Sequence, residues 1–317
     1  MREKRPFAQR SSVSGRKEAL RKYFLVYEGE NTESIYFDGI IANRDKIGIN
    51  PLIELVPVIR SYSEEGWSNP KKLIDRVQLN LEESAEGVIF CETLLNWIME
   101  YLSDEGIIRN NRTAAKAMWN TLLSICSNDL HINLNTRITN PDDVCSDILE
   151  FLRQKTQWSS IMSNVALVIT EGRGILFEEN FDKICFIIDR DRESFISKDG
   201  NDQYTYVLNK CRENNYGFYL SNPCFEFWLL MHFDEVTKLD PVNVLNNPRV
   251  TSKRRYLENE LRRLLPGFSK SKYRIDPLMA NIDKAIRNEK LFCEDEEALL
   301  NTAGSRVGLL ITELRTN

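Results

Sequence analysis

Residues 184–191 read Ile184-Cys185-Phe186-Ile187-Ile188-Asp189-Arg190-Asp191, five apolar side chains followed by two carboxylates two positions apart. A continuous apolar run of this length is typical of a strand buried on both faces of a parallel sheet. Side chains two apart on a strand point to the same face, so Asp189 and Asp191 can hold one cation together. The stretch therefore predicts a buried parallel strand that ends in a metal-binding pair.

A second stretch of the same kind lies near the N-terminus, where Tyr23-Phe24-Leu25-Val26-Tyr27 precedes Glu28-Gly29-Glu30. Open α/β sheets bind ligands at the carboxyl ends of their strands, so we expect the two acidic clusters to meet. Carboxylates that converge repel one another unless a cation neutralises them, and oxygen ligands suit Mg²⁺ or Mn²⁺. Glu28 is then a third ligand or the general acid/base, and Glu30 or Glu33 supplies a further oxygen.

Strand-like and helix-like segments alternate along much of the chain. Strands are expected at 22–27, 53–59, 181–188 and 216–220, with helices at 33–44, 71–83, 201–213, 224–233, 251–265, 274–290 and 303–315. The stretch at 165–169 is either a further strand or the end of an insertion. Pro57 favours an edge position or a bulge for its strand. This alternation predicts an α/β fold with a mainly parallel sheet flanked by helices.

Between residues 84 and 165 the apolar spacing is helical throughout, at 93–101, 113–126 and 142–158. We therefore expect an all-helical insertion. The predicted organisation is a basic tail at 1–21, an α/β core of 22–83 plus 165–235, the insertion at 84–164 and a helical C-terminal region at 236–317.

The composition is that of a soluble globular protein, with 42% hydrophobic and 28% charged residues and a net charge of −5 over 317 residues. There is no run of about 18 apolar residues, and no signal-peptide core at the N-terminus, so we expect a cytoplasmic protein without a membrane partner. Seven scattered cysteines without a C-x-x-C pair, and two histidines, argue against a structural zinc site.

Two segments are rich in basic residues, although the chain as a whole has a net negative charge. Residues 2–22 hold eight basic and two acidic side chains, and residues 249–274 hold nine and two. Such tracts either contact nucleic-acid phosphates or are solvated surfaces. Lys270, Lys272 and Arg274 are accordingly candidates for a nucleic-acid path or for an ordinary solvated helix face.

A long apolar segment from Ser221 to Phe233 carries a few polar residues. Ser221 and Asn222 follow a predicted strand and precede a helix, where they bind a phosphate or cap the helix. Glu226 lies among apolar neighbours and needs a partner if it is buried, either a metal or Arg190. Arg190 in turn contacts the scissile phosphate or pairs with the acids beside it.

Several segments resemble the RloB family, which includes the abortive-infection component AbiL, and its Toprim-type core. The matching segments are 27–37, 187–192, 221–233 and 305–310. The resemblance implies a Toprim-like fold, a Mg²⁺- or Mn²⁺-dependent nuclease site and a role in bacterial anti-phage defence, often with a co-encoded ATPase as partner. It also implies that Glu28 is the general acid/base and that Asp189 and Asp191 bind the metal. The insertion departs from the family pattern.

We therefore expect a metal-dependent endonuclease that cleaves DNA or RNA, with Arg190 as an additional catalytic residue. The alternative is a non-catalytic Toprim-like module that binds an ATPase, nucleic acid or both. Mutually repelling acids argue against the alternative, since a scaffold has no need of them. The sequence leaves the choice between DNA and RNA open, and also the oligomeric state, a homo-oligomer included.

Overall fold

The computed structural model describes residues 20–27, 31–58, 70–86, 88–104, 112–155, 177–190, 195, 202–252 and 254–316. The chain divides into two units. The helical unit contains described residues between 75 and 177, and the sheet unit contains those at 20–58, 70–74 and from 178 onward. No helix in the described part of the chain is long and apolar enough to cross a membrane. The stretch at 165–169 lies outside the described residues.

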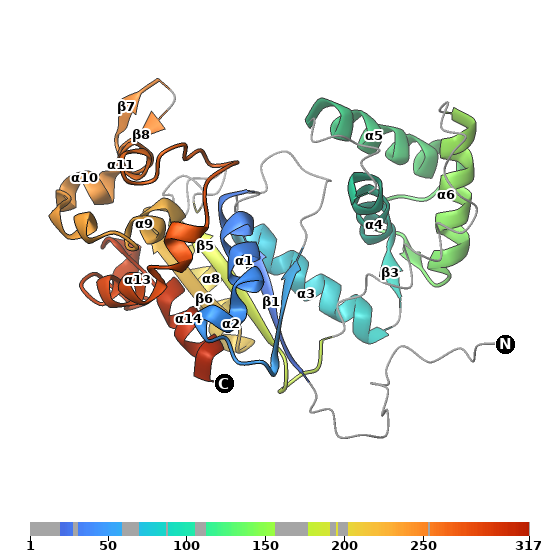
Figure 1. The fold of residues 1–317 in the computed structure, drawn as a ribbon. Helices are drawn as coiled ribbons and strands as arrows, with labels where there is room; N and C mark the ends of the chain where they lie inside the picture. Colours follow the sequence, from blue (N-terminus) through green and yellow to red (C-terminus); the bar gives the residue numbers. More distant parts are fainter. Residues whose placement is uncertain are drawn as a thin grey trace. The chain divides into compact units, whose positions relative to one another are not determined.

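The sheet unit is built on five strands in the order β2-β1-β5-β6-β9 (Figure 1). They are β1 (Arg21–Tyr27), β2 (Ile53–Val58), β5 (Lys183–Asp189), β6 (Gly217–Asn222) and β9 (Gly304–Ser305). The first four are parallel to their neighbours, and only β9 joins in the antiparallel direction. The predicted mainly parallel sheet is confirmed. Strand β2, which contains Pro57, lies at the edge, where a missing N–H removes no ladder hydrogen bond.

Alternate residues of the central strands are buried on opposite faces of the sheet. Cys185 and Ile187 of β5 belong to a hydrophobic cluster with the helices of one face. Phe186 is also fully buried, and its ring lies 5.6 Å from that of Tyr216, beyond the end of α8 (Tyr204–Glu213). Burial on both faces explains why the strand sequence is apolar without alternation.

The remaining elements of the sheet unit are mainly short helices. They are α1 (Thr32–Ala42), α2 (Arg44–Ile47), α9 (Phe225–Leu230), η2 (Asp234–Lys238), α10 (Pro241–Asn246), α11 (Tyr256–Leu264), α12 (Asp276–Met279), α13 (Ile282–Glu289), η3 (Ala298–Leu300) and α14 (Val307–Thr316). Helix α3 (Pro70–Glu86) begins in this unit and continues into the helical unit.

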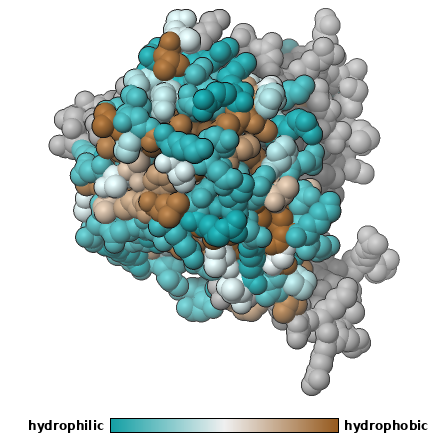
Figure 2. Space-filling view, turned by 60° about the vertical axis from the view of Figure 1, so that its left-hand side comes forward, coloured by the Kyte–Doolittle hydropathy of each residue, from teal (hydrophilic) through white to brown (hydrophobic). Residues whose placement is uncertain are grey.

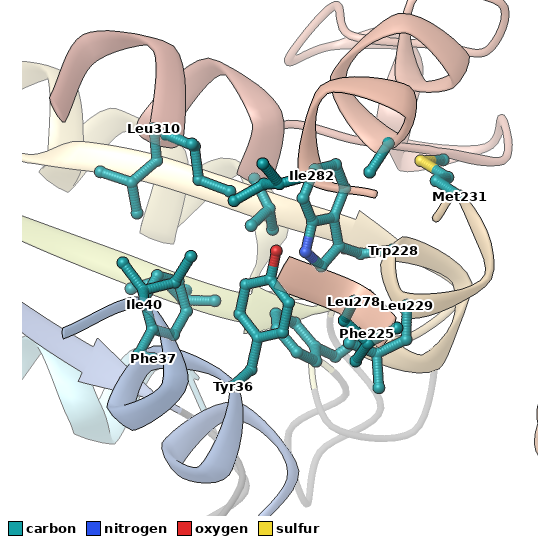
Figure 3. Close-up of a cluster of buried hydrophobic side chains, with 14 of the residues drawn as sticks. Tyr36, Phe37, Ile40, Phe225, Trp228, Leu229, Met231, Leu278, Ile282 and Leu310 are labelled. Atoms are coloured by element: carbon teal, nitrogen blue, oxygen red, sulfur yellow. The ribbon is translucent and has the colours of Figure 1, made fainter. Parts of the chain in front are cut away.

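Aromatic side chains join α1 to α9 in the core of this unit. Figure 3 shows the Tyr36 hydroxyl directed toward the Trp228 indole, and the two rings meet edge to face with centroids 6.2 Å apart. The same hydroxyl lies 3.1 Å from Nε2 of His232. Burial lowers the pKa of His232 to about 4, so this histidine is a neutral member of the core.

The C-terminal region is not purely helical, which corrects the sequence prediction. The helix expected at 251–265 begins only at Tyr256, because the preceding residues form an antiparallel ribbon of β7 (Arg249–Thr251) and β8 (Arg254–Arg255). The helix expected at 303–315 begins at Val307, since Gly304 and Ser305 pair with β6. Both errors arise because tertiary pairing overrides a local helical pattern.

The helical unit contains α4 (Cys91–Asp104), α5 (Arg112–Ser124), a π-helical turn (Ile125–Asp129) and α6 (Pro141–Lys155). Leu94, Leu122 and Ile148 from the three helices are fully buried in one cluster. The expected all-helical character needs correction, because β3 (Ile89–Phe90) pairs with β4 (Arg137–Ile138). Two residues per strand are too few to show a period of two in the sequence.

Candidate functional site

A cavity of about 410 Å³ lies at the carboxyl ends of β5 and β6. This is the place where open α/β sheets bind their ligands. Its walls come from the strand ends, from the first turn of α9, from the β7–β8 ribbon and from the loop after α11. The charged residues of the lining are Asp189, Arg190, Glu226, Arg249, Arg254, Arg255, Glu258 and Lys270.

Asp189 is the last residue of β5 and pairs in register with Ser221 of β6. It continues the odd-numbered set of Cys185 and Ile187, whose side chains lie on the face that α9 covers. Asp189 and Glu226 both line the cavity, although the sequence separates them widely. The structure thus brings together two of the predicted carboxylates.

Glu226 lies in the first turn of α9 and is 2% exposed. Its Oε1 is 2.8 Å from Nζ of Lys270, whose side chain is 62% exposed. Burial by itself would raise the pKa of Glu226, but the positive charge of Lys270 holds it below the ordinary range. Burial opposes the charge of Lys270, yet the pKa of the lysine is raised because Glu226 is close. Glu226 is therefore a buried anion with a cation beside it.

Arg190 follows Asp189 directly and is 5% exposed. Its Nη2 donates to Oδ2 of Asp202 at 2.7 Å, and its guanidinium lies over the rings of Phe195 and Tyr204. Its Nε and Nη1 have no hydrogen-bond partner among the residues that the structure describes. Asp202 and two aromatic rings thus hold the buried guanidinium at the wall of the cavity.

The predicted phosphate ligands Ser221 and Asn222 are both buried. The Ser221 hydroxyl lies 3.3 Å from that of Ser305 on β9, and the Asn222 amide donates to the Leu299 carbonyl at 2.7 Å. Asn222 also lines the cavity, whereas Ser221 does not. These bonds fix the end of β6 in place, and neither side chain caps α9, whose N-cap residue Cys224 makes no side-chain cap bond either.

The remaining predicted site residues lie elsewhere or outside the described residues. Glu33 is buried in the first turn of α1, and it is not among the residues lining the cavity. Lys272 and Arg274 are exposed and also lie outside the lining, unlike Lys270. Glu28, Glu30 and Asp191 fall outside the part of the chain that the structure describes.

Sequence reasoning missed the arginines of the ribbon. Arg249, Arg254 and Arg255 line the cavity opposite the strand ends, together with Glu258 of α11. They belong to the basic tract at 249–274, so the charge count was a usable signal. It could not single them out, because the expected helix would have distributed these side chains around its surface.

The acidic residues among the described lining offer only oxygen atoms as metal ligands. Carboxylates of this kind suit Mg²⁺ or Mn²⁺, and Glu226 already has the ammonium of Lys270 beside it. Within the described residues, no group of three or more His, Cys, Asp or Glu side chains is close enough to hold a metal. Asp189 and Glu226 are therefore the two carboxylates among the described residues of the predicted metal site that line the cavity, together with several basic residues.

Of the comparisons with known proteins, the one with protein families gave a match. No curated protein and no solved structure matches the chain. The sequence profile of the family described as RloB-like protein matches residues 23–314, which include the sheet except for the first two residues of β1, and all residues that line the cavity. The chain therefore belongs to the RloB-like family.

Proposed function

We propose that this protein is a metal-dependent nuclease that cleaves phosphodiester bonds of DNA or RNA in bacterial anti-phage defence. The main support for the proposal is that the carboxylates of Asp189 and Glu226 line one cavity together with the arginines of the β7–β8 ribbon. Metal-assisted cleavage of a phosphodiester uses acidic groups that bind the cation and positive charge that stabilises the phosphate. Membership of the RloB-like family is consistent with the defence role.

Asp189 and Glu226 are the described residues that would hold the metal. A bound Mg²⁺ or Mn²⁺ would stabilise negative charge on a phosphoryl oxygen. Asp191 as a further ligand and Glu28 as the general acid/base belong to the proposal through the Toprim resemblance, since both lie outside the described residues. A co-encoded ATPase as partner rests on the same resemblance.

The basic residues of the lining have a separate task in this proposal. Arg190 is held rigidly by Asp202, so its guanidinium is oriented before any substrate arrives. A preoriented planar donor suits a phosphate better than a mobile lysine does. Lys270 is mostly exposed and can leave Glu226 for a phosphate oxygen once a metal has neutralised that carboxylate. The acids thus bind the cation, and the bases bind the substrate.

The test compares Asp189→Asn with Asp283→Asn, a variant of an exposed aspartate on α13 that pairs with Arg315 outside the cavity. Each protein is incubated with plasmid, single-stranded DNA and tRNA in the presence of Mg²⁺ or Mn²⁺. We expect cleavage to fall by about 10²-fold or more in Asp189→Asn, as when one charge-stabilising group is removed from an active site. Asp283→Asn is expected to cleave like the wild type, and thermal unfolding verifies that both variants fold.

Undiminished cleavage by Asp189→Asn would overturn the assignment. The alternative of a non-catalytic module makes a different prediction, because the wild type would then cleave none of the substrates. Co-purification with an ATPase encoded beside the gene would support that alternative.

A further inference from the structure

The β7–β8 ribbon places two arginines directly opposite each other. Arg249 and Arg255 are register partners across the antiparallel pair, and Thr251 pairs with Arg254 beyond an irregularity. Like charges directly opposite each other on a ribbon destabilise it. None of Arg249, Arg254 and Arg255 forms an ion pair with an acid among the described residues, although other arginines do, such as Arg212 with Glu296. The three arginines of the ribbon therefore carry charge that no ion pair within the described part of the chain neutralises.

The same arginines face the candidate active site. Arg249, Arg254 and Arg255 line the cavity of Asp189 and Glu226, and so does Ser252 at the turn of the ribbon. The nearby basic groups are already engaged, because Lys270 pairs with Glu226 and Arg190 pairs with Asp202. Arg249, Arg254 and Arg255 are thus the basic residues of this lining without an ion-pair partner among the described residues, although the carboxylate of Glu258 lines the same cavity.

The base of the ribbon contacts the N-cap residue of α9, two residues beyond the end of β6. Asn247 adopts a left-handed conformation with φ 40°, and its Oδ1 accepts the N–H of Leu257 at 3.0 Å. Its side-chain amide contacts Sγ of Cys224 at 3.5 Å, one residue before α9. The Tyr256 N–H closes the ribbon onto the Pro248 carbonyl at 2.9 Å. The arginines are therefore held at a defined place beside the carboxylates, while the strands themselves extend outward (Figure 1).

We propose that the β7–β8 ribbon is a binding site for the phosphodiester backbone of a nucleic-acid strand, with Arg249 and Arg255 on phosphates flanking the one cleaved at Asp189. The inference deepens the proposed nuclease function and rests on it. Arginine's planar fork matches phosphate oxygens, and phosphates bound at Arg249 and Arg255 would neutralise the charges that repel each other across the ribbon. The face shown in Figure 2 is mostly hydrophilic, with hydrophobic patches among the hydrophilic residues.

The presence of several arginines on the ribbon favours a nucleic-acid strand, rather than a single phosphate, as its ligand. One phosphate needs one or two guanidinium groups, whereas a strand presents a row of phosphates. Three arginines in one cavity lining exceed what a single small phosphate requires. DNA and RNA share this backbone chemistry, and both serve as arms of the test.

The test measures binding without cleavage. Wild type, Arg249→Ala/Arg255→Ala and Arg287→Ala/Lys290→Ala are titrated into fluorescein-labelled single-stranded DNA and RNA in EDTA, and anisotropy is followed over a range of salt concentrations. The third protein is a matched control, because it removes two positive charges from exposed positions at α13 outside the cavity. EDTA keeps this test independent of the metal chemistry of the proposed function.

We expect the ribbon variant to bind at least about tenfold more weakly. The slope of log K against log salt concentration should fall in magnitude by about 1.4, the value for two lost phosphate contacts on a single strand. The control should retain the wild-type slope. The melting temperature of the ribbon variant should not fall, since the repulsion is gone. If it does fall, Arg249→Lys/Arg255→Lys is used instead, with weaker binding and an unchanged slope expected.

Three outcomes would overturn the inference. One is wild-type affinity and slope in the ribbon variant. Another is an equal loss in both double variants, which would indicate general surface charge. The third is competition by a nucleoside monophosphate as effective as that by the oligonucleotide, which would indicate a single-phosphate site. Binding by the ribbon variant tests this inference, whereas the dependence of cleavage on Asp189 tests the nuclease assignment. The two hypotheses can therefore fail separately.

Discussion

The two ends of the sheet hold acidic side chains in opposite situations. Near the amino ends of the strands, Glu313 of α14 accepts hydrogen bonds from the hydroxyls of Tyr23 at 2.9 Å and Tyr219 at 2.7 Å. Both of its oxygens also lie within 2.8 Å of Nζ of Lys183. At the carboxyl ends, Glu226 has one exposed lysine beside it and faces a cavity.

This difference separates a structural carboxylate from one that is available to a ligand. Burial opposes the charged form of Glu313, yet the bonds from Lys183 and Tyr219 lower its pKa. The pKa of Glu226 is lowered as well, but chiefly through one lysine that can move away. The two acids thus have the same charge state at neutral pH, and only the number and mobility of their partners distinguish them.

The largest expected effect is the loss of cleavage in Glu226→Gln. Glutamine keeps the size of the side chain but removes the charge that the proposed metal requires, so cleavage should fall by about 10²-fold. Stability should change little, since a neutral amide costs less to bury than the carboxylate does, and the exposed Lys270 is readily solvated. Cleavage assays on plasmid and tRNA, together with chemical denaturation, measure both quantities.

Glu313→Gln is the matched control and should show the reverse pattern. It weakens four charge-assisted hydrogen bonds outside the cavity, two from Lys183 and one each from Tyr23 and Tyr219, so the free energy of unfolding should fall by about 1–3 kcal/mol. Its cleavage rate should equal that of the wild type. Equal activity losses in both variants would remove the distinction between the two ends of the sheet.

A third acid, Glu289, extends the comparison, because its contribution to the free energy of unfolding should depend on pH. Glu289 at the end of α13 is fully buried, and its Oε1 accepts the Gly308 N–H at 2.9 Å. Burial raises its pKa from 4.5 to about 8. The unfolded chain loses this proton above about pH 4.5 while the folded chain keeps it, so stability falls as the pH rises toward 8.

Glu289→Gln should abolish this contribution, because glutamine resembles the protonated acid. We expect wild type to lose more unfolding free energy between pH 5 and pH 9 than the variant does, as measured by urea denaturation. Taking the difference between the two proteins cancels the opposite contribution of His232, whose pKa is lowered to about 4. Parallel pH profiles of the two proteins would show that Glu289 ionises normally.

The smallest effect is expected for Lys270→Ala. The change leaves the Glu226 carboxylate without its cation, but the lysine is 62% exposed, so the loss of stability at pH 7 should be only about 1 kcal/mol or less. If the same position binds a divalent cation, Mg²⁺ should raise the melting temperature of this variant more than that of wild type. An identical response of both proteins to Mg²⁺ would argue against a shared cation position, and Lys272→Ala serves as the control.

Much of the sheet was predictable because its strands are buried on both faces. Strand β5 was expected at 181–188 and is found at Lys183–Asp189, and β1 was expected at 22–27 and is found at Arg21–Tyr27. The ribbon β7–β8 was not predictable, because its strands are short and exposed and resemble the start of a helix. Short pairs depend on the partner strand rather than on an internal period.

The candidate site divides in the same way. Asp189 was predicted because it ends an apolar strand, and Glu226 because a charge among apolar neighbours needs a partner. The lysine that pairs with Glu226 was predicted as a nucleic-acid contact, and nothing in the local pattern linked the two residues. Arg249 and Arg255 were seen only as part of a basic tract.

The order of residues was enough to indicate an α/β fold with a mainly parallel sheet, the strand-end position of Asp189 and the RloB-like resemblance. These properties depend on local periodicity and on short motifs, which a linear sequence displays directly. Only the tertiary structure brought Glu226, Lys270 and the ribbon arginines to one cavity and gave Glu313 and Glu289 their different partners. Partner choice and pKa depend on distances across the fold, and those distances are not encoded in any local pattern.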